Sequence, residues 1–193
     1  MTVDHVAPAC ASQRTVCVRE NRLLAKDTYL LSLDDPEMAR DIRPGQFLMI
    51  RPGPGSDPLL GRPFALYDVR RDSQGQPIGV DVVYLVMGRG TAELTRRRAG
   101  DRLEVWGPLG NGFAPLSHSG PVAFVAGGIG QTPFLALAKW WTGRETYGGQ
   151  RLTGSLASTV RMYYGTRSAD LLAGLDDFES AGIDLKIATN DGS

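Results

Sequence analysis

The feature that most constrains the fold is a change of pattern near residue 120. Before this point, short segments rich in β-branched and aromatic residues are separated by turns of glycine, proline and aspartate. Several such strands at near-regular spacing favour a small antiparallel barrel or sandwich. After this point, strands and helices alternate, as expected of βαβ units that build a parallel sheet. The sequence therefore predicts two domains, residues 12–118 and residues 119–193.

The first half contains one predicted helix among six predicted strands. The helix is predicted over residues 91–99, with Thr91 as its N-cap and Gly100 directly after its last turn. We interpret residues 117–120 as the joint between the two domains. The predicted strands cover residues 14–21, 28–33, 45–51, 62–69, 80–87 and 101–107.

The second half contains three predicted strands and two predicted helices. Residues 143–159 are polar and rich in glycine, serine and threonine, which predicts a long surface loop. A parallel sheet of three strands is small and ends in an exposed edge strand, so we expect either that another element covers this edge or that the domain is truncated in this sequence. The strands are predicted over residues 121–126, 160–165 and 184–189, and the helices over residues 133–141 and 169–180.

Charge and the N-terminal sequence narrow the classes of partner. Lysine and arginine together number 21, as do aspartate and glutamate, so the formal net charge is zero. Such a chain has no overall field to attract nucleic acid or an anionic membrane. Residues 1–13 lack the basic and apolar regions of a signal peptide, and no apolar run approaches the roughly 20 residues of a membrane span. We expect a cytoplasmic protein that binds neither nucleic acid nor a membrane.

The cysteines and histidines indicate no metal site and no catalytic side chain. Cys10 and Cys17 match neither a CxxC pair nor the four thiolates of an iron-sulfur cluster. We interpret them as ordinary reduced thiols. His5 and His118 have no serine, cysteine or aspartate at a spacing that indicates a triad.

Residues 123–138 form the most informative local motif. An apolar strand is followed by Gly127, Gly128 and Gly130 and then by an apolar segment with helical spacing. A glycine-rich turn between a strand and a helix lets backbone N–H groups approach an anion. Pro133 stands where the dinucleotide-binding fingerprint has its third glycine, so the fingerprint is not met. The motif alone is compatible with a phosphate-binding turn and with a tight structural turn.

Two further segments have the chemistry of anion binding. Residues 87–94 pass from a strand through Gly88 and Gly90 into a helix at Thr91, which presents free N–H groups. Arg62 stands at the start of a strand, where a guanidinium can pair with a diphosphate through two hydrogen bonds. Taken alone, the first segment is more typical of a capped helix and Arg62 of a surface salt bridge.

Together, these motifs resemble the ferredoxin-NADP reductase superfamily, and most closely the electron-transfer subunits of two-subunit, NAD-dependent (class 1B) dihydroorotate dehydrogenases. The resemblance covers nearly all of residues 14–193, with the segments in family order. Order across seven segments is far more specific than any one motif. The segments are RPGQFLMIR, GRPFALYDV, YLVMGRGTAEL, AGDRLEVWGPLGNGF, VAGGIGQTPFLALA, YYGTRSADL and ATNDGS.

The resemblance implies an N-terminal antiparallel β-barrel that binds FAD, followed by a Rossmann-like domain that binds NAD(H). Within the barrel, Arg62 would pair with the FAD diphosphate, which the helix start after the strand would also receive. The implied FAD-binding residues are Arg62, Pro63, Phe64, Ala65, Gly88, Gly90 and Thr91. The implied NAD-binding residues are Gly127, Gly128, Gly130 and Pro133 in the phosphate turn, with Gly165, Arg167, Asp191 and Gly192.

The coenzyme preference is not visible in the residues themselves. NAD-specific Rossmann folds place an acidic residue near the end of the second strand for the ribose hydroxyls. Residues 163–167 contain no carboxylate, so a preference for NADH is implied only by the resemblance. Arg167 can equally meet the 2′-phosphate of NADPH.

Two departures from the family are visible. The family usually has serine or threonine near flavin N5 where this sequence has Ala65, which changes the geometry or electronics at that atom. Relatives also continue into a cysteine-rich segment that holds a 2Fe-2S cluster, whose cysteines this sequence lacks. FAD and NAD(H) are therefore the cofactors expected of these residues, and the cluster is expected only in the family.

The resemblance implies hydride transfer between NAD(H) and the flavin, with no catalytic side chain. The partner would be the FMN-containing catalytic subunit of dihydroorotate dehydrogenase, in a heterotetramer that serves pyrimidine biosynthesis. Two alternatives remain open. The chain can be a related reductase subunit of a ferredoxin:NADP or sulfide-linked complex, or a non-catalytic fragment that binds flavin or a nucleotide.

Overall fold

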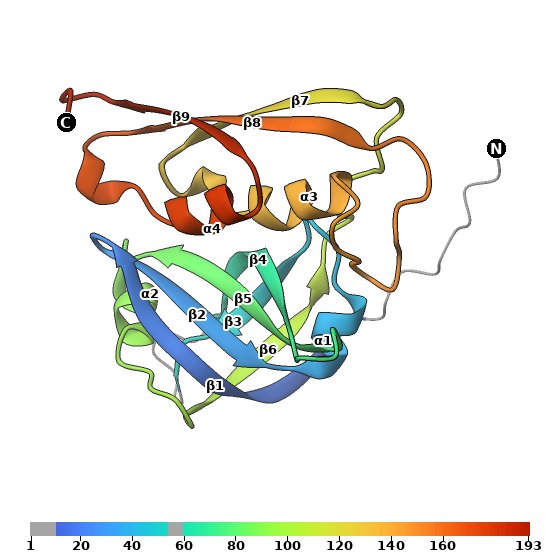
Figure 1. Cartoon of the computed structure of the whole chain (residues 1–193). Helices are drawn as coiled ribbons and strands as arrows, with labels where there is room; N and C mark the ends of the chain where they lie inside the picture. The colour runs from blue at the N-terminus through green and yellow to red at the C-terminus, as the bar shows by residue number, and fades with distance from the viewer. Residues whose placement is uncertain (1–10, 54–59) are drawn as a thin grey trace.

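The computed structural model describes residues 11–53 and 60–193. Cys10 and His5 lie outside these ranges. A closed six-stranded barrel comes first along the chain, and a parallel three-stranded sheet with helices follows it (Figure 1). This arrangement confirms the predicted fold class. No helix in the described ranges is long and apolar enough to cross a membrane.

The barrel is built from the six predicted strands, which are all antiparallel. Alternate residues point inward, so that Leu48 and Ile50 are fully buried. The ring closes because the first strand pairs with both the second and the last, with Cys17 opposite Asp34 and Arg102. In spatial order the strands are β1 (Ser12–Ala25), β2 (Thr28–Asp34), β5 (Pro77–Leu85), β4 (Arg62–Arg71), β3 (Phe47–Arg51) and β6 (Arg102–Leu109).

A helix that the sequence analysis missed follows β2. Helix α1 (Pro36–Asp41) begins with proline, whose absent N–H group needs no partner at that position. The Asp35 carboxylate accepts a hydrogen bond from the Met38 N–H at 3.0 Å and acts as the N-cap. The pair Asp35–Pro36 was the available signal for this helix.

Helix α2 (Arg89–Leu94) starts before the predicted helix 91–99. Gly88 rather than Thr91 is the N-cap, so that prediction is wrong. Thr91 occupies the third helical position, and its hydroxyl accepts hydrogen bonds from the N–H groups of Met87 (2.9 Å) and Gly88 (3.2 Å). The hydroxyl therefore reaches back to the residues that precede the helix.

The same helix also ends earlier than predicted, at Leu94, and a residue distant in the sequence contacts its end. The side-chain amide of Asn21 on β1 donates to the carbonyl oxygens of Leu94 (2.8 Å) and Arg97 (3.2 Å). Leu94 is the last residue of α2 and Arg97 lies three residues beyond it, so the Asn21 amide holds the segment in which the chain leaves the helix. The helix does not reach Gly100, the residue that was predicted to follow its last turn.

The second part contains three parallel strands in the order of the sequence, as predicted. They are β7 (Gly120–Gly127), β8 (Ala157–Thr166) and β9 (Asp184–Thr189), with helices α3 (Phe134–Trp141) and α4 (Leu175–Ser180). The helix predicted over 169–180 is wrong in its first half. A short 3₁₀ turn (Ala169–Leu171) comes first, and Gly174, with a φ of 75°, separates it from α4.

Helices α3 and α4 lie between the sheet and the barrel (Figure 1). The inner face of the sheet packs on these helices and buries Phe124, Met162 and Tyr164. On the outer face, Val125 is 77% exposed and Tyr163 is 46% exposed, and no described helix covers them. Parallel sheets are ordinarily covered on both faces. In the described part of this chain, by contrast, helices cover one face of the sheet only.

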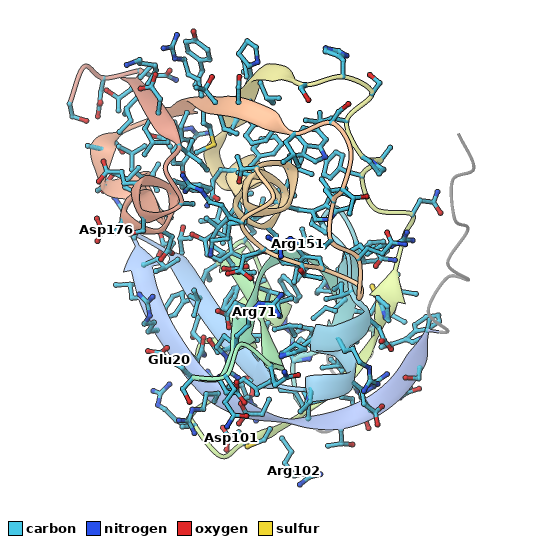
Figure 2. The ribbon with its side chains drawn as sticks, turned by 45° about the vertical axis from the view of Figure 1, so that its right-hand side comes forward. Glu20, Arg71, Asp101, Arg102, Arg151 and Asp176 are labelled. Carbon is cyan, nitrogen blue, oxygen red and sulfur yellow. The ribbon has the colours of Figure 1, made fainter. Side chains whose placement is uncertain are left out.

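The predicted surface loop packs against the barrel. β8 begins at Ala157, so the loop is shorter than the predicted 143–159. Within it Tyr147 is only 1% exposed, which contradicts the prediction of a purely surface loop. Arg71 of β4 donates to the carbonyl oxygen of Thr146 and forms an ion pair with Glu145 at 2.9 Å. Figure 2 shows Arg71 on the barrel side of this contact.

Candidate functional site

Two clefts open between the barrel and the carboxyl ends of the parallel strands. The barrel cleft has a volume of about 590 Å³ and is lined by Arg62, Pro63, Phe64, Ala65, Val83, Tyr84, Leu85, Met87, Gly88, Arg89, Gly90, Thr91, Ile129, Gly130 and Thr132. The edge cleft has a volume of about 600 Å³ and is lined by Asp27, Thr28, Leu85, Val86, Met87, Gly128, Ile129, Tyr164, Gly165, Thr166, Arg167, Leu171, Ala173 and Asn190. Leu85, Met87 and Ile129 belong to both clefts.

One wall of the barrel cleft comes from β4 and β5. Phe64 packs edge-on against Tyr84, with ring centroids 5.8 Å apart, which gives this wall an aromatic surface. The exposed Arg62 guanidinium donates to the carbonyl oxygens of Leu60 (3.2 Å) and Gly61 (3.3 Å). Within the described ranges, Arg62 has no carboxylate at ion-pair distance, so its charge faces the cleft without a neutralising group.

All seven residues predicted to bind FAD line the barrel cleft. Strand β4 brings the first four together at its start, and the segment around α2 supplies the remaining three. The two groups are separated in sequence by the whole of β5, and the closed barrel places them at one end.

The residues predicted to bind NAD are only partly gathered. Gly128, Gly165 and Arg167 line the edge cleft, whereas Gly130 lines the barrel cleft. The other four, Gly127, Pro133, Asp191 and Gly192, are not among the lining residues of either cleft.

Asp191 is engaged in a local turn. Its carboxylate accepts hydrogen bonds from the backbone N–H (3.1 Å) and the hydroxyl (2.7 Å) of Ser193, and these bonds lower its pKa. Pro133 is the N-cap of α3, after a 3₁₀ turn over Gly128–Gln131. These two residues are therefore accounted for by local structure.

Three glycines in or next to the clefts are explained by neither packing nor backbone conformation. A Cβ atom at Gly88, Gly127 or Gly130 would have no atom within 4 Å, and none of the three has a positive φ. Glycine that the fold does not require marks places where another group can approach the backbone closely. At Gly128 the φ of 52° gives a conformational reason for glycine as well.

The edge cleft contains residues that the sequence analysis missed. Asp27 is in the tight turn between β1 and β2 with a φ of 53°, a conformation that aspartate tolerates better than most residues. Among the described residues that line the two clefts it is the single acidic side chain, beside the cations Arg62, Arg89 and Arg167. Asn190 also lines the edge cleft. No local motif marks Asp27, because the barrel brings its hairpin to the sheet edge from far away in the sequence.

The predominance of cations in the clefts favours anionic ligands over metal ions. Within the described residues, no group of three or more histidine, cysteine, aspartate or glutamate side chains is placed to hold a metal ion. A 2Fe-2S cluster therefore does not fit these residues.

Comparison with known proteins shows which proteins this chain resembles in sequence. No family model matches it. It is 35% identical to the electron transfer subunit of dihydroorotate dehydrogenase B (NAD(+)) from Desulforamulus reducens over 172 residues, which are 89% of this chain and 59% of the relative. The corresponding subunit from Clostridium acetobutylicum is 33% identical over 177 residues, which are 91% of this chain and 61% of the relative. The chain is a homologue of these electron transfer subunits.

The chain spans about three fifths of the length of these curated relatives. Among solved structures, an NADH-dependent reduced ferredoxin-NADP oxidoreductase matches with a TM-score of 0.70 and 23% identity. The match covers 92% of this chain and 57% of that one. The barrel and the parallel sheet thus form a ferredoxin-NADP reductase fold.

Proposed function

We propose that this chain carries flavin-dependent electron transfer between NAD(H) and a partner subunit. The barrel cleft would hold FAD, and the edge cleft would hold NAD(H). The partner would be the FMN-containing catalytic subunit of dihydroorotate dehydrogenase, with domains divided as predicted at residues 118 and 119. The names of the homologues support the partner, and the two clefts support the cofactors.

The observation that carries the proposal is the shared wall of the two clefts. Leu85, Met87 and Ile129 line both, so ligands in the two clefts lie against the same three side chains. Hydride transfer needs the donor and acceptor to be held within contact distance and shielded from water. Met87 is 81% exposed in this structure, which leaves a flexible apolar side chain available to cover bound ligands.

The barrel residues would hold the flavin cofactor by charge and shape. Arg62 would pair with the diphosphate, because its remaining guanidinium donors point at no described carboxylate. Gly88, Gly90 and Thr91 would let the same diphosphate approach the backbone, since no Cβ blocks Gly88. Phe64 and Tyr84 would provide an apolar wall for a planar ring system. Ala65 would stand closest to flavin N5.

The parallel sheet would present the nicotinamide coenzyme. Gly128, which lines the edge cleft, would accommodate its phosphates together with its neighbours Gly127 and Gly130 in the same turn, and Gly165 and Arg167 would lie on the adenosine side. Asp27 adds a carboxylate at the edge cleft that can accept hydrogen bonds from ribose hydroxyls. Bound FAD would supply hydride exchange with the nicotinamide and electron exchange with the partner subunit, and the residues of this chain would orient the reactants and exclude water.

The first experiment is an anaerobic visible absorbance spectrum. The purified chain is loaded with FAD, desalted, and measured before and after addition of NADH, with NADPH in a parallel sample. We expect a retained flavin spectrum that bleaches with NADH. A chain that retains no flavin, or whose flavin NADH does not reduce, would contradict the proposal. Retained flavin without reduction would favour a binding fragment without turnover.

A glycine pair tests the assignment of the barrel cleft. Gly88→Ala would place a methyl group where we assign the diphosphate, whereas Gly154→Ala places one in equally open space in the loop before β8. Because neither glycine has a positive φ or a close neighbour, both variants should keep the thermal midpoint of the parent chain. We expect FAD affinity, measured by fluorescence titration, to fall about tenfold (~1.4 kcal/mol) in the first and not in the second. Equal affinities would remove Gly88 from the site.

A further inference from the structure

A partly buried polar cluster joins the barrel to the second part of the chain at the side chain of Asp68. One carboxylate oxygen of Asp68 accepts a hydrogen bond from the Lys139 ammonium, and the other accepts one from the Tyr147 hydroxyl at 2.7 Å. Asp68 belongs to β4, Lys139 to α3, and Tyr147 to the loop between α3 and β8. One carboxylate therefore holds two separate segments of the second part against the barrel.

The cluster is shielded from water. The side chains of Asp68 and Lys139 are 16% and 25% exposed, and Tyr147 is 1% exposed. Burial and the neighbouring Asp68 carboxylate raise the pKa of Tyr147, so this hydroxyl remains a donor. Partners in such an environment depend on one another, because removing one leaves another polar group buried without compensation.

A second contact lies beside the first and uses the adjacent residue of β4. The hydroxyl of Tyr67 donates to the Asp177 carboxylate on α4 at 2.8 Å. Burial raises the pKa of Tyr67, with a smaller contribution from Asp177, so this hydroxyl also stays protonated. Two consecutive residues of β4 thus fix both α3 and α4.

The elements joined by Asp68 are connected along the chain to residues that line the clefts: β4 lines the barrel cleft at its start, and α3 follows the turn whose Gly128, Ile129 and Gly130 line the clefts. On β4, Asp68 follows Ala65 of the barrel cleft by three positions along a continuous strand. On the other side, Lys139 lies in the helix that the glycine turn leads into. A strand and a helix are stiff over such distances. A shift at Asp68 is therefore passed to the relative position of the two clefts.

We propose that Asp68 is a positioning residue that sets the nicotinamide-binding part in register with the flavin-binding barrel, an inference that rests on the proposed function. It touches neither ligand in this assignment. Its effect appears in the rate of hydride transfer and not in the affinity for either cofactor. A displacement on the order of 1 Å between reactants is enough to cost up to about 100-fold in rate.

The test is Asp68→Asn in the full chain, with Asp176→Asn as the control. Asp176 is an exposed carboxylate on α4, labelled in Figure 2, and neighbours Asp177. Stopped-flow reduction of bound FAD by NADH gives the limiting rate and the apparent NADH dissociation constant separately. We expect Asp68→Asn to lower the limiting rate about 10- to 100-fold, with FAD and NADH affinities changed less than threefold. The control should match the parent chain.

A double variant separates positioning from a general loss of stability. Asp68→Asn leaves the Lys139 charge without its carboxylate, whereas Asp68→Asn combined with Lys139→Met removes the charges together. We expect the double variant to recover the thermal midpoint while flavin reduction stays slow. Recovery of the rate together with the midpoint would overturn the positioning role, as would a parent-like rate in Asp68→Asn. A parent chain whose flavin is not reduced by NADH would instead overturn the proposed function and this inference with it.

Discussion

Asp81 on β5 shows how one buried carboxylate gives the fold a pH dependence. The Asp81 side chain is 14% exposed, and the Nε atom of Arg70 lies 3.4 Å from its Oδ1 atom. Burial raises the pKa of Asp81 to about 6, against the opposing effects of a hydrogen bond from Ser32 and the charge of Arg70. The folded chain therefore holds this proton more tightly than the unfolded chain, in which an aspartate pKa is about 3.9. The stability from this group is present below about pH 4 and is lost as pH rises through about 6.

We predict that Asp81→Asn makes the protein more stable than its parent at pH 7.5, by about 1–3 kcal/mol, and that the difference disappears near pH 4. The asparagine keeps the shape of the side chain and carries no charge to bury. Urea unfolding at several pH values measures the difference. Asp176→Asn, which changes an exposed carboxylate, should stay within about 0.5 kcal/mol of the parent at each pH. A difference for Asp81→Asn that does not vary with pH would contradict the assignment.

At the scale of single elements, helix α2 depends on the barrel. Asn21 makes three hydrogen bonds, donating to Leu94 and Arg97 and accepting from the Tyr84 hydroxyl at 3.1 Å. Asn21→Ala removes all three and leaves two carbonyl groups at the helix end without this partner. The same helix carries Gly90 and Thr91 of the barrel cleft, so its anchoring bears on the proposed flavin site.

We expect Asn21→Ala to lower the free energy of unfolding by about 2–3 kcal/mol, at about 1 kcal/mol for each hydrogen bond. Chemical denaturation followed by circular dichroism gives this value. Gln74→Ala, in the exposed turn between β4 and β5, is the comparison and should change stability by less than about 0.5 kcal/mol. A parent-like stability in Asn21→Ala would mean that water replaces the amide at no cost.

The elements also show which parts of the fold are readable from sequence. The strands and the parallel order of the second part were predicted because alternation and strand–helix succession are local patterns. Helix ends were not, since Asn21 contacts the end of α2 from another strand and Gly174 interrupts the predicted second helix with a left-handed backbone. Tyr147 was assigned to a surface loop because its contacts with the barrel, such as the hydrogen bond to Asp68, join residues far apart in the sequence.

Some residues of the candidate site were likewise predicted from the sequence, and others were not. The residues around Arg62 and Gly88 were predicted from the order of several motifs along the chain, because the glycine bend or the arginine taken alone is more typical of a structural feature. Asp27 and Asn190 were missed, since only the folded chain brings a hairpin of the barrel to the carboxyl edge of the sheet. Asp68 was missed for the same reason.

At the scale of the whole molecule, the contact between the two parts includes a close fit at Gly174. A Cβ atom there would lie 2.3 Å from the Tyr67 hydroxyl oxygen, and Gly174 has a φ of 75°. Gly75 has a similar φ of 78° but nothing within 4 Å of its Cβ position. Comparing alanine substitutions at Gly75 and Gly174 therefore separates the cost of a left-handed backbone from the cost of disturbing the contact between the barrel and the second part of the chain.

We predict that Gly75→Ala costs about 1–2 kcal/mol from the left-handed backbone alone. Gly174→Ala should cost at least about 1 kcal/mol more, because the methyl group displaces Tyr67 from Asp177. Thermal and urea unfolding of both variants give the comparison. Adding Tyr67→Phe to Gly174→Ala removes the clashing oxygen and should recover part of the loss. Equal costs for the two alanines would show that the parts do not meet closely at this point.

The pairing of β1 with β6 has a consequence for how the protein is made. These strands close the barrel, yet β6 leaves the ribosome only after the four strands between them have been synthesised. Until then one edge of β1 has no partner, and unpaired edges invite association between nascent chains. Arg19 and Glu20, both exposed, closely follow the residues of β1 that pair with β6, Ser12–Cys17, and charges of this kind oppose such pairing. The strand that waits longest for its partner thus carries its own protection against aggregation.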